Sequence, residues 1–363
     1  MMSSSENYLF WISVTHFVPQ IGFVSSIFFG LILLTSNYLG AQKMFGSYKF
    51  LISAFTTLGM IFATVEIIVY PVLHRLEIQN FKFFQNVHNY KAGVLFFSFT
   101  ESFGLSGSKT KNIPIAGYTF FHSATMSLLS VQFIYRYWAV FNVDKLRYFK
   151  GRQAVVWFIY CSFFGFQYAI GTFVFWALDD VSSDYFREEV LLRYNANISN
   201  FPAMSIVAYD PVDGSVRWWN VMGILNIFSI VNIQYGVMIY CGWSMHTKMA
   251  DKIKSFSPTL RKHHEQLFRT LILQIFQITA PTLILFIPIT FMIVLPMFNL
   301  DISLPSGVLL CSFTLYPAMD SIIVMCVVSE YRITAKKIFK VIRKIIIEIN
   351  QSRNEPTATS SAP

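Results

Sequence analysis

The chain has 363 residues, of which 54% are hydrophobic and only 13% are charged, and its mean hydropathy is +0.50. A soluble domain carries about 25% charged residues, so a soluble fold of this length would have more apolar surface than its interior can bury. The composition therefore predicts a membrane protein. The net charge of +9 lies in short basic blocks between apolar runs, which favours anionic lipid over nucleic acid as a partner.

Seven apolar runs are long enough to cross a membrane as helices, which takes about 20 residues each. They cover residues 11–35, 49–70, 113–138, 154–178, 219–245, 267–297 and 304–328. The sixth run contains Pro281 and Pro288, which a spanning helix tolerates as kink sites. The short run 94–99 is expected in a loop. We therefore predict an all-α membrane protein, built as a seven-transmembrane helix bundle.

The distribution of lysine and arginine predicts the orientation of the bundle. Alternate connections hold 20 of the 28 basic residues, in segments 41–50, 136–152, 246–269 and 331–353. The opposite segments hold the other 8, in 71–112 and 179–218, with none in 298–303. This asymmetry predicts an extracellular N-terminus and a cytoplasmic C-terminus, which agrees with an odd number of spans.

The connection 179–218 is long and rich in aspartate and glutamate, and it carries a candidate glycosylation site at Asn197. On the predicted orientation this connection is extracellular. It could form a lid over a pocket between the helices, or it could be a solvated acidic loop. The sequence leaves both interpretations open.

Residues 330–350 follow the seventh span and repeat apolar side chains at helical spacing opposite a set of lysines and arginines. This pattern predicts a basic amphipathic helix on the inner leaflet of the membrane. The expected organisation is an extracellular N-terminus (1–10), the seven-transmembrane domain (11–329), this helix, and a disordered cytoplasmic tail (351–363).

The sequence predicts no enzyme, no metal site and no cofactor. All four cysteines lie in apolar runs, without the spacing of a metal site or of a surface disulfide framework; they are Cys161, Cys241, Cys311 and Cys326. The acidic residues cluster in the connections, and no nucleophile stands at a recognisable spacing from a base.

Arg136 stands at the cytoplasmic end of the third span, between Tyr135 and Tyr137. A boundary arginine can simply extend its charge to the lipid headgroups. The aromatic neighbours and the basic loop that follows favour a second interpretation. Seven spans with an extracellular N-terminus is the layout of G protein-coupled receptors, in which an arginine at this point faces the G protein.

Short motifs spread along nearly the whole chain carry a family resemblance. They are residues 46–51 (GSYKFL), Glu66 with Pro71, 133–138 (FIYRYW), 238–242 (MIYCG), 277–282 (QITAPT) with Pro288, 311–320 (CSFTLYPAMD) and 330–332 (EYR). In order and spacing they resemble the nematode seven-transmembrane chemoreceptors of the Str family, the group that includes the diacetyl odorant receptor. One departure is Ser321, where the family often has proline.

The resemblance implies a chemosensory receptor that binds a small odorant or soluble molecule from outside and activates a heterotrimeric G protein. It implies a multi-pass plasma-membrane protein on the cilium of chemosensory neurons. The residues expected to serve G-protein coupling or activation are Arg136, Tyr135, Tyr137, Asp320, Tyr316, Pro317 and Pro288. Asp320 lies about 18 Å along the helix from Arg332 and serves either an activation switch or a structural polar link.

A ligand pocket is expected among the outer halves of the spans. His122 lies about 21 Å along the third span from Arg136, where it could face a cavity or be a packing residue. Glu66 lies about 26 Å along the second span from Lys49, where it could line a pocket mouth, pair with a loop cation or face water. The candidate contacts are Thr119, His122, Ser123, Met126, Asn226, Gln277, Thr279 and Glu66.

One alternative function comes from a different class of protein. A seven-span ligand-gated cation channel would have the inverse orientation, with its N-terminus in the cytoplasm. The charge asymmetry argues against it. Membrane lipids are expected partners and nucleic acid is not, and the sequence leaves self-association open.

Overall fold

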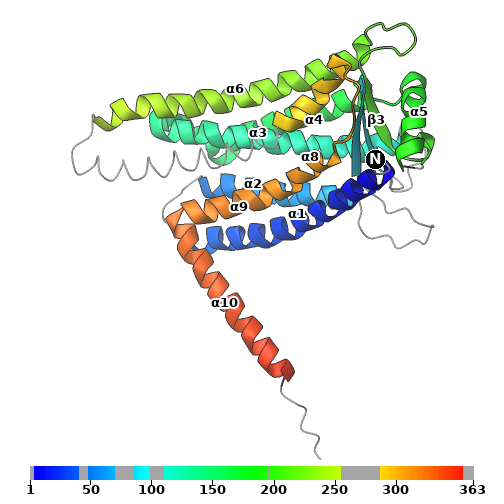
Figure 1. Ribbon diagram of the computed structural model, residues 1–363. Helices are drawn as coiled ribbons and strands as arrows, with labels where there is room; N and C mark the ends of the chain where they lie inside the picture. The colour runs from blue at the N-terminus through cyan, green and yellow to red at the C-terminus, as the bar shows by residue number, and fades with distance from the viewer. Residues whose placement is uncertain are drawn as a thin grey trace, which may run out of the picture.

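The computed structural model describes residues 4–40, 48–69, 85–98, 110–194, 196–254 and 287–354. In these ranges the chain forms a bundle of long helices with a small antiparallel sheet at one end (Figure 1). The helices of the bundle are α1 (Ser4–Gly40), α2 (Tyr48–Val69), α3 (Ile113–Phe141), α4 (Val155–Phe175), α6 (Trp218–Lys254), the segment Ile287–Phe298, α8 (Gly307–Cys311) and α9 (Tyr316–Val327).

Four stretches of helix within the described ranges are long and apolar enough to cross a membrane. They are Phe17–Leu39, Lys49–Ile68, Gly151–Phe175 and Trp218–Lys248. Helix α3 is more polar because it lies at the centre, packed against α2, α4 and α6. Its small hydroxyl residues are buried against these helices, so they face protein and not lipid.

The seventh predicted span differs from a single straight helix, and the sixth is described only in part. Of the sixth, only the part from residue 287 onward is described, and Pro281 lies outside the described residues. The seventh is built from α8, a 3-10 turn η6 (Ser312–Leu315) and α9, with Pro317 in the first turn of α9. Proline fits a first helical turn because no intrahelical donor is needed there.

The prediction that residues 94–99 form a loop is wrong. Residues Gly93–Ser98 form strand β2 in a four-stranded antiparallel sheet of order β3-β2-β1-β4. The other strands are β1 (Gln85–Tyr90), β3 (Ala203–Val207) and β4 (Ser303–Pro305). The run has no polar face because both faces are covered. Val94 and Phe96 pack with the bundle, while Leu95 and Phe97 pack with helix α5.

The acidic connection 179–218 is an ordered cap on this end of the bundle. It contains α5 (Asp180–Tyr194), a 3-10 turn η4 (Ile198–Asn200) and β3. Asp179 accepts a hydrogen bond from the Ser182 backbone at 2.9 Å and pairs with Arg217, so it fixes the start of α5. Burial alone would raise the pKa of Asp179, but these hydrogen bonds and the Arg217 charge lower it. We call this end of the bundle the sheet end.

Helix α10 (Ser329–Asn354) leaves the opposite end of the bundle at a steep angle to α9 (Figure 1). Tyr331, fully buried at its start, donates a hydrogen bond to Asn37 of α1 at 2.7 Å. Beyond that anchor Ile338 still packs against the core, whereas the isoleucines from Ile345 onward are exposed. The helix covers the residues expected to be amphipathic, and its contact with lipid stays a prediction.

Candidate functional site

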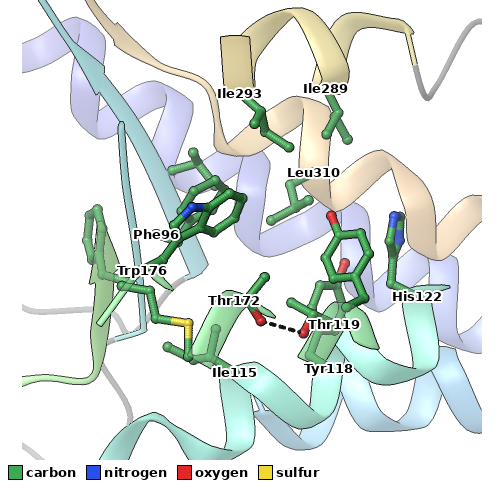
Figure 2. A pocket seen from close by; sticks show the side chains of 14 residues that line it. Phe96, Ile115, Tyr118, Thr119, His122, Thr172, Trp176, Ile289, Ile293 and Leu310 are labelled. Carbon is green, nitrogen blue, oxygen red and sulfur yellow. Dashed lines mark hydrogen bonds between the residues drawn. The ribbon is translucent and has the colours of Figure 1, made fainter. Parts of the chain in front are cut away.

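A cavity lies at the sheet end, between α3, α4, the sheet, α8 and the segment Ile287–Phe298 (Figure 2). Its volume is about 50 Å³, counted as the space open to the centre of a water-sized molecule. Its wall is largely apolar and aromatic, and consists of Val87, Phe96, Phe97, Ile115, Tyr118, Thr119, His122, Tyr168, Thr172, Trp176, Met204, Ile289, Ile293 and Leu310. A wall of this kind suits a small uncharged molecule.

The polar groups of the cavity come from the central helix and its neighbour. The hydroxyls of Thr119 on α3 and Thr172 on α4 lie 3.1 Å apart (Figure 2). The His122 ring is buried among aromatic rings, edge-on to Phe313 at 4.8 Å between centroids and to Tyr168 at 5.9 Å. These groups could orient a ligand, whereas the surrounding apolar wall would set its size.

Several expected pocket residues instead join helices to one another. The Ser123 hydroxyl donates to the Phe164 carbonyl of α4 at 3.0 Å. Asn226 on α6 accepts from the Gln167 amide of α4 at 3.0 Å. Met126 is buried in the core. These three side chains lie outside the cavity wall. Gln277 and Thr279 lie outside the described residues.

Glu66 differs from the expectation that it could face water near the outer surface. Its side chain is fully buried in α2, which packs between α1, α3 and α9. Within the described ranges its carboxyl oxygens have no hydrogen-bond partner, and Glu66 is not part of the cavity wall. Counting residues from Lys49 gives the position of Glu66 along the axis of α2, but it does not show on which face of the helix Glu66 lies.

The opposite end of α3 buries a charge. Arg136 is 3% exposed, so its side chain lies inside the bundle and does not extend to the surface. The carboxylate of Asp320 on α9 is also buried and is attracted by the Arg136 guanidinium. Tyr135 packs edge-on against Phe149, and Tyr137 packs near Tyr240 of α6. We call this the arginine end.

The other expected activation residues lie along α9 and the segment Ile287–Phe298. Tyr316 is buried and packs edge-on against Phe55 of α2 at 6.3 Å. Pro317 touches α2 at Gly59, where an added Cβ would lie 2.9 Å from the proline Cβ. Pro288 is half-buried in the first turn of the segment Ile287–Phe298.

The sheet end also holds a buried polar cluster that the sequence analysis missed. Glu189 of α5 lies 3.2 Å from the His88 ring of β1 and accepts hydrogen bonds from Arg193 at 3.0 Å and from Ser303 of β4 at 2.6 Å. Tyr194 lies 2.9 Å from the other ring nitrogen of His88. Burial would raise the pKa of Glu189, but these bonds outweigh it and lower the pKa to about 2. The cluster ties α5 to two strands.

The sequence analysis also missed the strand residues that line the cavity. Val87, Phe96 and Met204 come from the sheet, which the sequence analysis did not expect. The alternation of Val94 and Phe96 with Leu95 and Phe97 between two partners is the period of a strand. In the sequence these four residues are all apolar, so no alternation was visible that could have predicted the strand.

Long apolar helices packed together as a bundle define a multi-pass membrane protein. The chain matches the sequence model described as "Serpentine type 7TM GPCR chemoreceptor Str" over residues 15–336. It therefore belongs to the Str family of serpentine chemoreceptors, and the predicted seven-transmembrane helix bundle is confirmed.

Individual relatives agree with this family. The chain is 32% identical to G-protein coupled receptor str-33 of Caenorhabditis elegans over 327 residues, which cover 89% of this chain and 90% of the relative. It is 24% identical to serpentine receptor class r-10 of Caenorhabditis elegans over 331 residues, 89% of this chain and 90% of the relative. The Caenorhabditis briggsae protein of the same name is 24% identical over 357 residues, 97% of both chains.

Proposed function

We propose that this chain binds a small molecule from outside the cell in the cavity at the sheet end and activates a heterotrimeric G protein at the arginine end. The observation that carries the proposal is the placement of one helix. Helix α3 contributes Thr119 and His122 to the cavity and, about 21 Å further along, buries Arg136, which interacts electrostatically with the buried Asp320. A change at one end of α3 can therefore reach the other end.

The ligand that fits this proposal is small and uncharged. Most of the cavity wall is hydrocarbon or aromatic ring, which would leave a charged group without solvation. The paired hydroxyls of Thr119 and Thr172 offer a hydrogen-bonding group on one wall. The phenylalanines that enclose the cavity add shape selectivity.

Activation in this proposal changes the packing of helices at the arginine end. Ligand binding favours one of two helix arrangements only if it contacts them differently. Arg136 and Asp320 sit on α3 and α9, so a shift between these helices changes their distance. Tyr135, Tyr137, Tyr316, Pro317 and Pro288 would shape that movement, and the exposed basic loop after α3 would contact the G protein.

The orientation follows the distribution of basic residues. We place the sheet end outside and the arginine end in the cytoplasm, at the plasma membrane and on the cilium of chemosensory neurons. The candidate glycosylation site Asn197 agrees with this orientation, because it is exposed at the sheet end. Its side-chain oxygen accepts a hydrogen bond from the Ser199 backbone at 3.1 Å, and the amide nitrogen, to which a glycan would be attached, takes no part in that bond. Helix α10 would lie on the inner leaflet.

A signalling assay tests the function. Cells that express the chain with a G protein are exposed to a panel of small volatile and water-soluble molecules, and nucleotide exchange is measured. For an activating molecule, Arg136→Ala should abolish the response with the surface amount retained. Arg187→Ala, which removes an exposed arginine of α5 at the sheet end, is the control and should respond normally. A full response from surface-delivered Arg136→Ala would refute the coupling role.

A further inference from the structure

A second, smaller chamber adjoins the cavity between α6 and the segment Ile287–Phe298. It leaves about 20 Å³ to the centres of water-sized molecules. It shares four wall residues with the cavity: His122, Tyr168, Ile289 and Ile293. The two chambers therefore lie on either side of these four side chains.

Among the described residues, the remaining wall of the second chamber comes from α6 and the segment Ile287–Phe298. From α6 it takes Ile224, Ile227, Phe228 and Val231, and from the segment Ile287–Phe298 it takes Thr290 and Val294. Phe228 is 46% exposed, whereas Ile224 and Ile227 are buried. The chamber thus leads from the His122 ring outward to the bundle surface between these helices, with Phe228 at its mouth.

The sheet end offers a far more closed route. Val87, Phe97 and Met204 of the cavity roof are 1% exposed, and α5 covers the outer face of the sheet with Phe186 and Val190 fully buried. A molecule passing there would have to separate hydrogen-bonded strands, which pair over Gln85–Tyr90 with Gly93–Ser98 and over Gly93–Phe97 with Ala203–Val207. Between α6 and its neighbour it would have to displace the half-exposed Phe228 ring and then pass the side chains that the two chambers share, without breaking a strand pairing. Exposed side chains change rotamer in nanoseconds or less.

We propose that ligand reaches the cavity sideways from the bilayer, between α6 and the segment Ile287–Phe298, with Phe228 as the gate. This rests on the cavity being the ligand site. The passage is lined by hydrocarbon except for Thr290 and the inner His122 and Tyr168. The ligand class is therefore an uncharged apolar molecule that partitions into lipid before it binds, and a charged water-soluble molecule cannot use this path.

Accessibility of a cysteine in the cavity tests the route without a known ligand. Thr119→Cys is placed in the receptor in lipid nanodiscs and treated with neutral ethyl methanethiosulfonate or with its charged trimethylammonium analogue. Peptide mass mapping separates this site from the four native cysteines. The neutral reagent should react, and the charged one should react at least about tenfold more slowly.

Variants at the gate give the decisive comparison. Phe228→Trp should slow the neutral reagent by about tenfold, and Phe228→Ala should accelerate it. Leu225→Trp, at a 53% exposed position of the same helix outside both chambers, should leave the rate within about twofold. Equal rates in all three variants, or equal rates for both reagents, would overturn the sideways route. The reaction reports access alone, so a receptor that fails to signal leaves this result intact.

Discussion

The two ends of the bundle hold buried charge in opposite ways. At the sheet end, the Glu189 carboxylate receives donors from α5 and β4 and contacts the His88 ring of β1. At the arginine end, Asp320 is attracted by Arg136, but its Oδ1 atom accepts no hydrogen bond from the described residues. A carboxylate that accepts several hydrogen bonds fixes its elements in one arrangement, whereas a carboxyl group with an unbonded oxygen can change its contacts at lower cost. We infer that the sheet end is a rigid frame and the arginine end is the movable part.

The largest expected effect comes from replacing Glu189, the acceptor in the polar cluster at the sheet end. Glu189→Ala removes the acceptor shared by the buried His88 ring and by the half-buried Arg193 and Ser303 side chains, so the free energy of unfolding in nanodiscs should fall by about 3 kcal/mol. Glu188→Ala removes a neighbouring exposed carboxylate and should change little. Equal stability of the two variants would show that the cluster does not hold the sheet to α5.

Acid should weaken the same cluster in a defined range. The pKa of Glu189 falls from its ordinary 4.5 to about 2 in the folded protein, so its contribution is complete above pH 4.5 and is lost as the pH falls toward 2. The loss should reach about 3 kcal/mol. Thermal unfolding of the purified receptor across this range measures it, and Glu189→Gln should remove this part of the dependence. An unchanged acid profile in that variant would assign the effect to other groups.

The contact that positions α9 should be sensitive to one methyl group. In Gly59→Ala the new Cβ would lie 2.9 Å from the Pro317 Cβ, so α2 and α9 must separate, at a cost of about 1–3 kcal/mol. Gly236→Ala on α6 meets no atom within 4 Å and should be neutral or slightly stabilising. Unfolding temperatures and surface amounts of the two variants compare them. Similar behaviour would mean that α9 is loosely held at Pro317.

The smallest effect concerns the movable pair itself. Asp320→Asn keeps the shape but removes the acidic group that interacts with Arg136, so signalling without ligand should rise about five- to tenfold, equivalent to about 1 kcal/mol. Glu348→Gln, which removes an exposed acid of α10, should leave basal signalling unchanged. Basal nucleotide exchange at equal surface amounts is the measurement. A decrease in Asp320→Asn would mean that the charge pair favours the active arrangement.

The membrane helices were predictable because lipid imposes one length and one composition on them. The seven apolar runs located the bundle, and the family match over residues 15–336 agrees with it. Helix α3 was found despite its hydroxyl residues, since its flanks are apolar. The sheet was not found, because a six-residue strand covered on both faces has no polar alternation to separate it from a loop or a buried helix.

The sequence predicted how far along each helix the candidate site residues lie, but not which face of the helix they occupy. Counting residues placed His122 and Thr119 at the level of the cavity, and both line it. Ser123 and Met126 lie at the same level on other faces of α3, and Glu66 is buried away from the cavity wall. Helix rotation is set by the packing of neighbours, which hydropathy does not encode.

The central claim is that the rigid sheet end faces the outside and the movable arginine end faces the cytoplasm. A cysteine is placed at Glu188 on α5 or at Arg152 beyond α3, both exposed, and intact cells are treated with a membrane-impermeant maleimide. Labelling above that of the unmodified chain should occur for Glu188→Cys, and for Arg152→Cys only after permeabilisation. The reverse pattern would contradict the account and would favour the inverse orientation of a ligand-gated channel.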